Sequence, residues 1–179
     1  MINGPNIQPD IFTAKFSTGD LAKAADVTTA ALQTWIRRGL IVGVDGIGID
    51  MPGCPGFRRA FSFENVMEVA VGAALIKGGN APAEAFKAAR EFAYTGSDDR
   101  HPAMLFKKRF TWLFVDGDRC QVLTSLGSSA WLGRKMNFFL QASDGFYVLL
   151  VDHVFDRAVQ SLNRTMTERL GLNEKEFNA

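Results

Sequence analysis

The chain has 179 residues, of which 47% are hydrophobic and 22% are charged, so it can bury a core as one domain or two small ones. Its 20 Lys and Arg residues nearly balance 19 Asp and Glu residues, and the formal charge of +1 excludes a protein held to nucleic acid by its overall field. No apolar run approaches the roughly 18 residues that span a bilayer. Residues 1–16 also lack a basic segment followed by an apolar one, so we expect a cytoplasmic protein with no membrane partner.

The first regular pattern along the chain is a pair of short helices. Residues 1–15 show no periodicity, which predicts a flexible arm. Ser17 or Thr18 suits the N-cap of a first helix, Thr28 suits that of a second, and Gly39 is a typical helix stop. One apolar face recurs at helical spacing in each, formed by Leu21, Ala22 and Ala25 and then by Leu32, Trp35 and Ile36. Two short helices separated by a tight turn predict a helix-turn-helix.

A β-wing and two longer helices follow. The segment IVGVDGIGIDMPGCPGFRRAF, residues 41–61, predicts two short strands joined by a long turn. Ser62 suits the cap of a third helix, with Asn65 in the capping-box position, and Pro82 suits the first turn of a fourth. Residues 95–102 are polar and rich in turn formers, so we place a domain boundary there, after a first domain over residues 16–95.

The second half of the chain predicts a small α+β domain over residues 103–172, followed by a tail at 173–179. Apolar runs flank Asp116-Gly117 and again Ser143-Asp144-Gly145, which indicates two β-hairpins, and a long helix starts at Asp152. Its apolar stripe through Leu162 and Leu170 fits either a homodimer seam or a helix covering its own sheet. The fold class we predict is mostly α with β.

The outward face of the second helix carries residues that suit DNA recognition. With Leu32 and Ile36 on the core face, the opposite face holds Thr29, Ala30, Gln33 and Arg37. Gln can make two hydrogen bonds to an adenine edge, Thr can contact thymine, and Arg can contact guanine or a phosphate. Arg37 and Arg38 also suit a plain helix end, where cations complement the dipole, and a lone Trp35 is commonly a core residue.

Arg58 and Arg59 favour the DNA interpretation. They lie on the returning strand of the predicted wing, where neighbouring side chains point to opposite faces. One of the two is therefore expected on the same side as the exposed helix face, which gives a neutral chain a local basic surface.

At this point the sequence resembles a family. TGDLAKAADVTTAALQTWIRRGLI is similar to the helix-turn-helix of MerR-type transcriptional regulators, and GFRRAFSFENVMEVAVGAALIKGG is similar to their wing-to-helix segment. The resemblance covers residues 16–92, about half of the chain. It implies a winged helix-turn-helix that binds double-stranded DNA, with residues 28–38 as recognition helix, Trp35 near a backbone phosphate and Arg58 as wing arginine. The DNA-binding set expected from pattern and resemblance together is Thr28, Thr29, Ala30, Gln33, Thr34, Trp35, Arg37, Arg38, Arg58 and Arg59.

The chain also departs from that family. Phe61 stands where a tyrosine is usual, Gln33 where many members have arginine, and Ile36 where an acidic residue is common. The wing is longer and richer in glycine, and hairpins precede the terminal helix. Cys54 and Cys120 do not reproduce the family's metal-binding pattern, so we expect no metal and no cofactor, and Cys54 as an ordinary loop cysteine.

The function expected from the sequence is therefore that of a non-enzymatic, sequence-specific DNA-binding regulator acting as a homodimer, because a second half-site supplies affinity that one small module lacks. The second domain is expected to dimerise or to sense a small-molecule or protein effector. Two alternatives stay open: an excisionase-like architectural protein that bends DNA, and a protein-interaction module that does not bind DNA. We expect His153 to be a residue of the helix start. We expect the basic run at Lys107, Lys108 and Arg109 to be a solvated face.

Overall fold

The computed structural model describes residues 10–41, 49–50, 59–117, 119–124 and 146–170. The chain is mostly α-helical with β-structure, as the sequence predicts. The helices are α1 (Asp10–Thr13), α2 (Thr18–Ala24), α3 (Thr29–Arg37), α4 (Phe63–Lys77), α5 (Pro82–Tyr94) and α7 (Val151–Leu170). The strands are β1 (Ile49–Asp50), β2 (Ala60–Phe61), β3 (Thr111–Asp116), β4 (Arg119–Thr124) and β5 (Tyr147–Leu150). None of the helices in the described residues is both long and apolar enough to cross a bilayer.

The helix starts follow the predicted caps. Ser17 accepts a hydrogen bond from the backbone N–H of Asp20, and the Asp20 carboxylate accepts one from the backbone N–H of Ser17, which forms a reciprocal capping box for α2. Ser62 and Asn65 make the same arrangement for α4, so a short amide side chain serves where Glu or Gln is usual. Pro82 lies in the first turn of α5, as predicted.

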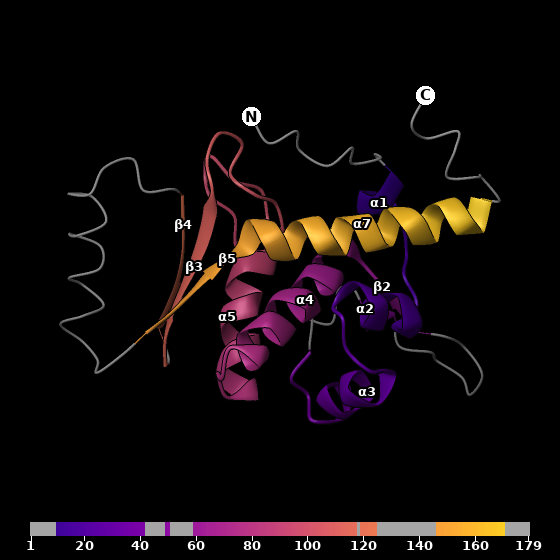
Figure 1. Ribbon diagram of the computed structural model, residues 1–179, viewed down its shortest axis with the longest axis horizontal. Helices are drawn as coiled ribbons and strands as arrows, with labels where there is room; N and C mark the ends of the chain where they lie inside the picture. The colour runs from indigo at the N-terminus through magenta and orange to yellow at the C-terminus, as the bar shows by residue number, and fades with distance from the viewer. Residues whose placement is uncertain (1–9, 42–48, 51–58, 118, 125–145, 171–179) are drawn as a thin grey trace.

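Helix α4 runs through the middle of the core. It is apolar around most of its circumference, and eleven of its fifteen residues are buried, which is typical of a helix covered on all sides. Helix α5 and the long α7 pack against it, with α2 alongside (Figure 1). Gly72 permits the close approach of α5, because a Cβ atom at this position would lie 2.8 Å from Cε1 of Phe86.

The sheet confirms one predicted hairpin and describes part of the other. Strands β3 and β4 pair antiparallel on either side of Asp116 and Gly117, as predicted. The turn and first arm of the second predicted hairpin fall at 125–145, outside the described residues. Its last arm is β5, which pairs antiparallel with β3, so the sheet order is β4-β3-β5.

Two segments expected to be loose or linking contain buried residues. In the predicted arm over residues 1–15, residues 10–13 form α1, and Ile11 is fully buried in the core. In the predicted boundary at 95–102, Arg100 is only 4% exposed and the backbones of Ser97 and Arg100 pair. One hydrophobic cluster includes residues from α1 through α7. The division into domains at 16–95 and 103–172 stays a prediction, and the tail at 173–179 lies outside the described residues.

The apolar stripe of α7 is used within the chain. Its residues as far as Leu162 are buried among the other elements, and Phe155 contacts the Phe63 ring of α4 edge to face at 6.0 Å. Of the two interpretations left open for this stripe, the part through Leu162 covers the chain's own core. The side chain of Leu170 lies outside the described residues.

Candidate nucleic-acid interface

Helix α3 has well-defined ends. The Thr28 hydroxyl accepts a hydrogen bond from the backbone N–H of Ala31 at 3.2 Å and caps the first turn. At the other end Gly39 has φ +67°, and the N–H groups of Gly39 and Leu40 bond to the carbonyls of Ile36 and Trp35. This is the Schellman arrangement, in which a residue in the left-handed conformation closes the helix. Both ends of α3 therefore lie where its capping residues predict them.

The turn between α2 and α3 is joined to α4. Asp26 has φ +52°, and the N–H groups of Asp26 and Val27 close α2 on the carbonyls of Lys23 and Ala22. The Lys77 ammonium at the end of α4 donates to the Asp26 carboxylate at 2.6 Å and to its backbone carbonyl at 3.0 Å. This hydrogen bond, together with the positive charge of Lys77, lowers the pKa of Asp26.

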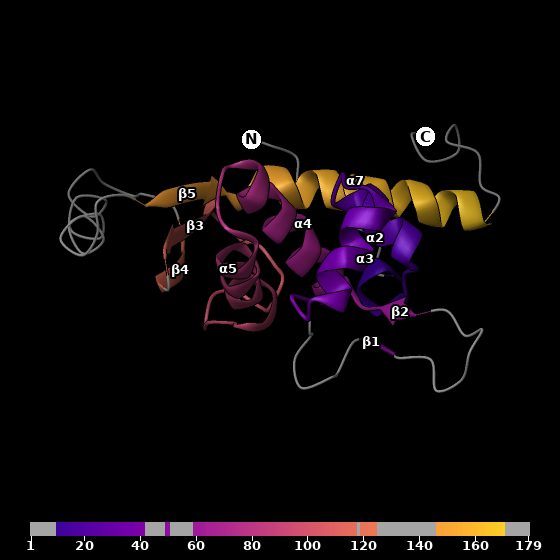
Figure 2. The same ribbon diagram turned by 90° about the horizontal axis from the view of Figure 1, so that it is seen from below.

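The outward face of α3 is polar and exposed. The exposed predicted site residues are Thr28, Thr29, Ala30, Gln33, Arg37 and Arg38. The first turn carries no acidic residue that would repel an anion from the helix N-terminus. Figure 1 shows α3 on the side of the molecule away from α7, and Figure 2, seen from below, shows it in front of α4 and α7. The exposure that helical periodicity predicts is confirmed.

Thr34 and Trp35 have partners within the protein. The Thr34 hydroxyl donates to the Ala30 carbonyl at 2.9 Å and accepts a 3.4 Å hydrogen bond from Arg37, so it is engaged locally. The Trp35 ring is partly buried and meets Phe86 of α5 edge to face, with 5.1 Å between ring centroids. Trp35 therefore packs against the core, and its expected contact with a phosphate stays a prediction.

The wing arginines are only partly described. Arg58 lies outside the described residues. Arg59 directly precedes β2 and is partly buried. Phe61 of β2 pairs with Ile49 of β1 and, on its own N–H and carbonyl, with the backbone of Phe16 at 2.9 Å in both directions. The two short strands therefore lie next to the N-terminus of α2.

An open groove of about 780 Å³ lies beside the turn between α2 and α3. Its lining includes the apolar side chains of Val27, Trp35 and Ile76 and the charged Lys77. Periodicity did not indicate this groove, because residues of α2, α3 and the C-terminal end of α4 line it together.

A contact between two residues far apart in the sequence was also missed. The Arg169 guanidinium near the end of α7 forms an ion pair with the Asp20 carboxylate, which also completes the capping box of α2. Burial opposes ionisation of Asp20, but hydrogen bonds from Ser17 and the charge of Arg169 outweigh it and lower the pKa of this carboxyl. The sequence predicted Ser17 or Thr18 as the N-cap of α2, whereas no local signal predicts that Arg169 pairs with Asp20.

A second missed group is a buried polar network between α4 and α5. The Tyr94 hydroxyl donates to the Glu68 carboxylate at 2.7 Å and accepts from the Asn65 amide at 2.8 Å. Asn65 and Glu68 are both fully buried. Burial, followed by the charge of Glu68, raises the pKa of Tyr94 far above its ordinary value. Asn65 therefore completes the capping box of α4 and also links this helix to Tyr94 of α5.

Comparison of the chain with protein-family models and with curated proteins found no match. The resemblance to MerR-type regulators therefore rests on the residues quoted above. In the part of the chain that the structure describes, no three His, Cys, Asp or Glu side chains are grouped so as to hold a metal ion.

Proposed function

We propose that this protein is a sequence-specific, dimeric DNA-binding regulator. In this proposal α2 and α3 form a helix-turn-helix, α3 enters the major groove of double-stranded DNA, and the segment from β1 to β2 is a wing that contacts the flanking backbone. The observation that carries the proposal is the division of α3 into two faces. One face packs through Leu32 and Trp35, and the other presents polar and cationic side chains.

The exposed face has the chemistry that base recognition needs. Gln33 lies near the middle of the helix and offers both a donor and an acceptor, which match the edge of adenine. Thr29 and Ala30 lie at the N-terminal end, where the helix dipole favours a nearby phosphate. Arg37 and Arg38 supply phosphate contacts at the other end.

The experiment is selection of bound fragments from genomic DNA by the intact protein, followed by affinity measurements on the selected sequence. The double variant Arg37→Ala with Arg58→Ala is expected to bind more weakly and with a shallower salt dependence, by about 0.9 in log–log slope for each lost phosphate contact. Gln33→Ala is expected to relax the base preference at one position, at a cost of about 1–3 kcal/mol.

The matched control is Lys108→Ala with Arg109→Ala, which removes two exposed cations from another part of the surface. It should leave DNA affinity close to that of the parent. Failure to enrich any sequence motif, or equal losses in both double variants, would remove the proposal.

A protein-interaction module is the second candidate, favoured by the groove beside α3 with its apolar lining. It predicts that Arg37→Ala with Arg58→Ala leaves DNA affinity unchanged. Strong bending of the selected DNA without an effect on transcription would instead identify an architectural protein.

A further inference from the structure

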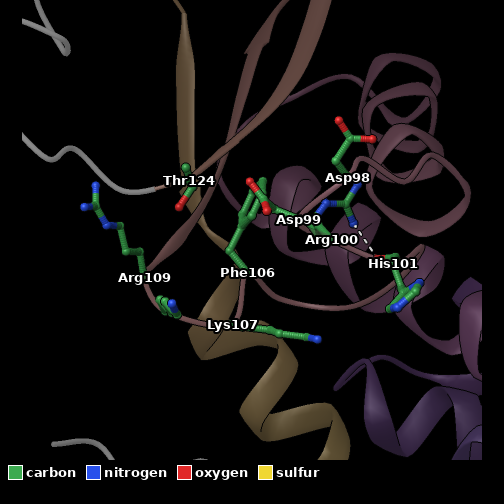
Figure 3. Close-up of a pocket in the computed structure, with 9 residues that line it drawn as sticks. Asp98, Asp99, Arg100, His101, Phe106, Lys107, Arg109 and Thr124 are labelled. Carbon is green, nitrogen blue, oxygen red and sulfur yellow. Dashed lines mark hydrogen bonds between the residues drawn. The ribbon is translucent and has the colours of Figure 1, made fainter.

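A pocket of about 440 Å³ lies between the segment after α5 and the end of β4 (Figure 3). This volume lies within the range of about 300–1,000 Å³ that is common for small-molecule sites. The residues around it include both acidic and basic side chains, with the Phe106 ring between them. This pocket takes no part in the proposed contact of α3 with DNA.

The inner wall of this pocket carries a buried cation. The Arg100 side chain donates hydrogen bonds from Nη1 to the carbonyls of Phe92 at 3.0 Å, His101 at 3.2 Å and Met104 at 3.3 Å, and from Nη2 to that of Thr95. These acceptors hold the guanidinium in place, but carbonyl groups carry only partial charge. Burial lowers the pKa of Arg100, and the Glu91 carboxylate opposes this shift only in part.

Charged groups of both signs surround Arg100. Lys107, Lys108 and Arg109 add three cations, and Asp98 and Asp99 add two carboxylates. In the part of the chain that is described, none of these five side chains makes an ion pair or a hydrogen bond. In Figure 3, Arg109 lies on the opposite side of the Phe106 ring from Asp98. The Arg100 guanidinium lies on the same side of the ring as Asp98, so Arg109 is the labelled cation that stands apart from that carboxylate.

We propose that this pocket binds a small bipolar molecule, one that carries an acidic group and an amine, such as a free amino acid or a dipeptide. The acidic group lies against the basic side formed by Lys108 and Arg109. The amine lies against Asp98 and Asp99, and the aliphatic part of the ligand covers the Phe106 ring. Charge-assisted hydrogen bonds at both ends select this class over ligands with one kind of charge.

The test is calorimetric titration of the full chain with each common α-amino acid and with glycylglycine, compared with succinate, which has only acidic groups, and putrescine, which has only amines. At least one bipolar compound is expected to bind with a dissociation constant of millimolar or lower. Succinate and putrescine are expected to bind more weakly than that compound. Absence of binding by every bipolar compound, or equally tight binding by succinate or putrescine, would overturn the proposal.

Two variants test the residues themselves. Asp98→Asn with Asp99→Asn, and Lys108→Ala with Arg109→Ala, change exposed groups that make no ion pair among the described residues, so the fold is expected to persist. Each is expected to weaken binding by about tenfold or more. The control is Arg37→Ala with Arg58→Ala, which should bind the ligand as the parent does. The same double variant is the test for DNA binding. Ligand binding and DNA binding are therefore measured with different variants, and either proposal can fail without affecting the test of the other.

Discussion

Asp26 occupies a backbone conformation that usually belongs to glycine. Gly39 and Gly79 hold the equivalent positions after α3 and α4, with φ of +67° and +101°, whereas Asp26 closes α2 with φ +52°. Aspartate is tolerated there better than most residues, because its short polar side chain can bond locally. Here the carboxylate binds Lys77, so the residue that closes α2 also joins the turn to α4. Glycine would relax the backbone but could not make that contact.

The first prediction follows from these two roles of Asp26. Asp26→Ala is expected to lower the thermal midpoint by a few degrees, because alanine keeps the strained conformation and loses the carboxylate that binds Lys77. Asp26→Gly is expected to recover most of this loss through relief of strain. Thermal unfolding followed by circular dichroism measures both variants. Equal midpoints for the alanine and glycine variants would show that the left-handed conformation costs nothing here.

At the scale of elements, the packing of α5 against α4 determines where the Phe86 ring that contacts α3 lies. Gly72 of α4 leaves room for the Phe86 ring of α5, and the same ring contacts Trp35 of α3. A change at Gly72 therefore reaches the candidate interface through a single aromatic side chain.

Gly72→Ala is expected to lower the free energy of unfolding by about 1–3 kcal/mol, because the added methyl group overlaps a buried ring. This range is the net change, because the overlap is expected to outweigh the gain in helix propensity from alanine, which is about 1 kcal/mol in an exposed helix. Urea denaturation measures it, and displacement of the Trp35 indole signal in an NMR spectrum should accompany it.

Gly19→Ala in α2 is the matched control. A Cβ atom at Gly19 meets only the Ser17 hydroxyl oxygen, at an ordinary 3.6 Å. This variant should be neutral or slightly stabilising, since it changes helix propensity alone. If Gly72→Ala behaved in the same way, the contact between α4 and α5 would be adaptable.

The elements that the sequence predicted correctly are those with local signals. Ser62, Pro82 and Gly39 act on neighbouring residues, so the ends of α3, α4 and α5 could be placed without knowing the fold. The same holds for Asp116-Gly117, which directs the turn between β3 and β4. For the candidate interface, helical periodicity predicted the exposed face of α3, including Gln33.

What could not be predicted depends on partners that are distant in sequence. Residues 95–102 look like a linker because they are polar, yet Arg100 is buried by carbonyls that converge from residues 92–104. The pairing of β5 with β3 and the ion pair of Asp20 with Arg169 also require the complete fold. For the same reason neither pocket could be located from the sequence.

At the scale of the whole molecule, α7 joins the two ends of the structure. Figures 1 and 2 show the sheet at one end of the long axis and α2 and α3 towards the other. Helix α7 starts at the sheet and extends past α4 to α2. The Asp152 carboxylate accepts a hydrogen bond from the backbone N–H of Thr111 at the start of β3, at 2.7 Å. Near the other end Arg169 pairs with Asp20 of α2. Between these contacts the apolar face of α7 lies in the common core.

This arrangement predicts that the described parts unfold together. Leu162 of α7 is fully buried, so Leu162→Ala is expected to lower the free energy of unfolding by about 2–5 kcal/mol. Fluorescence of variants that retain only Trp35 or only Trp112 reports the α3 end and the sheet end separately. The two urea curves should coincide and should shift together, because one continuous core is weakened.

Gln160→Ala on the same helix is the control for that shift. Gln160 is exposed, so its variant should stay within about 0.5 kcal/mol of the parent. Two separate transitions, of which Leu162→Ala moves only one, would contradict a single cooperative unit and would support independent domains at 16–95 and 103–172. A coincident shift would instead mean that a ligand bound in the pocket near Arg100 and DNA bound at α3 act on the same folded unit, so each would add to the stability measured at the other end.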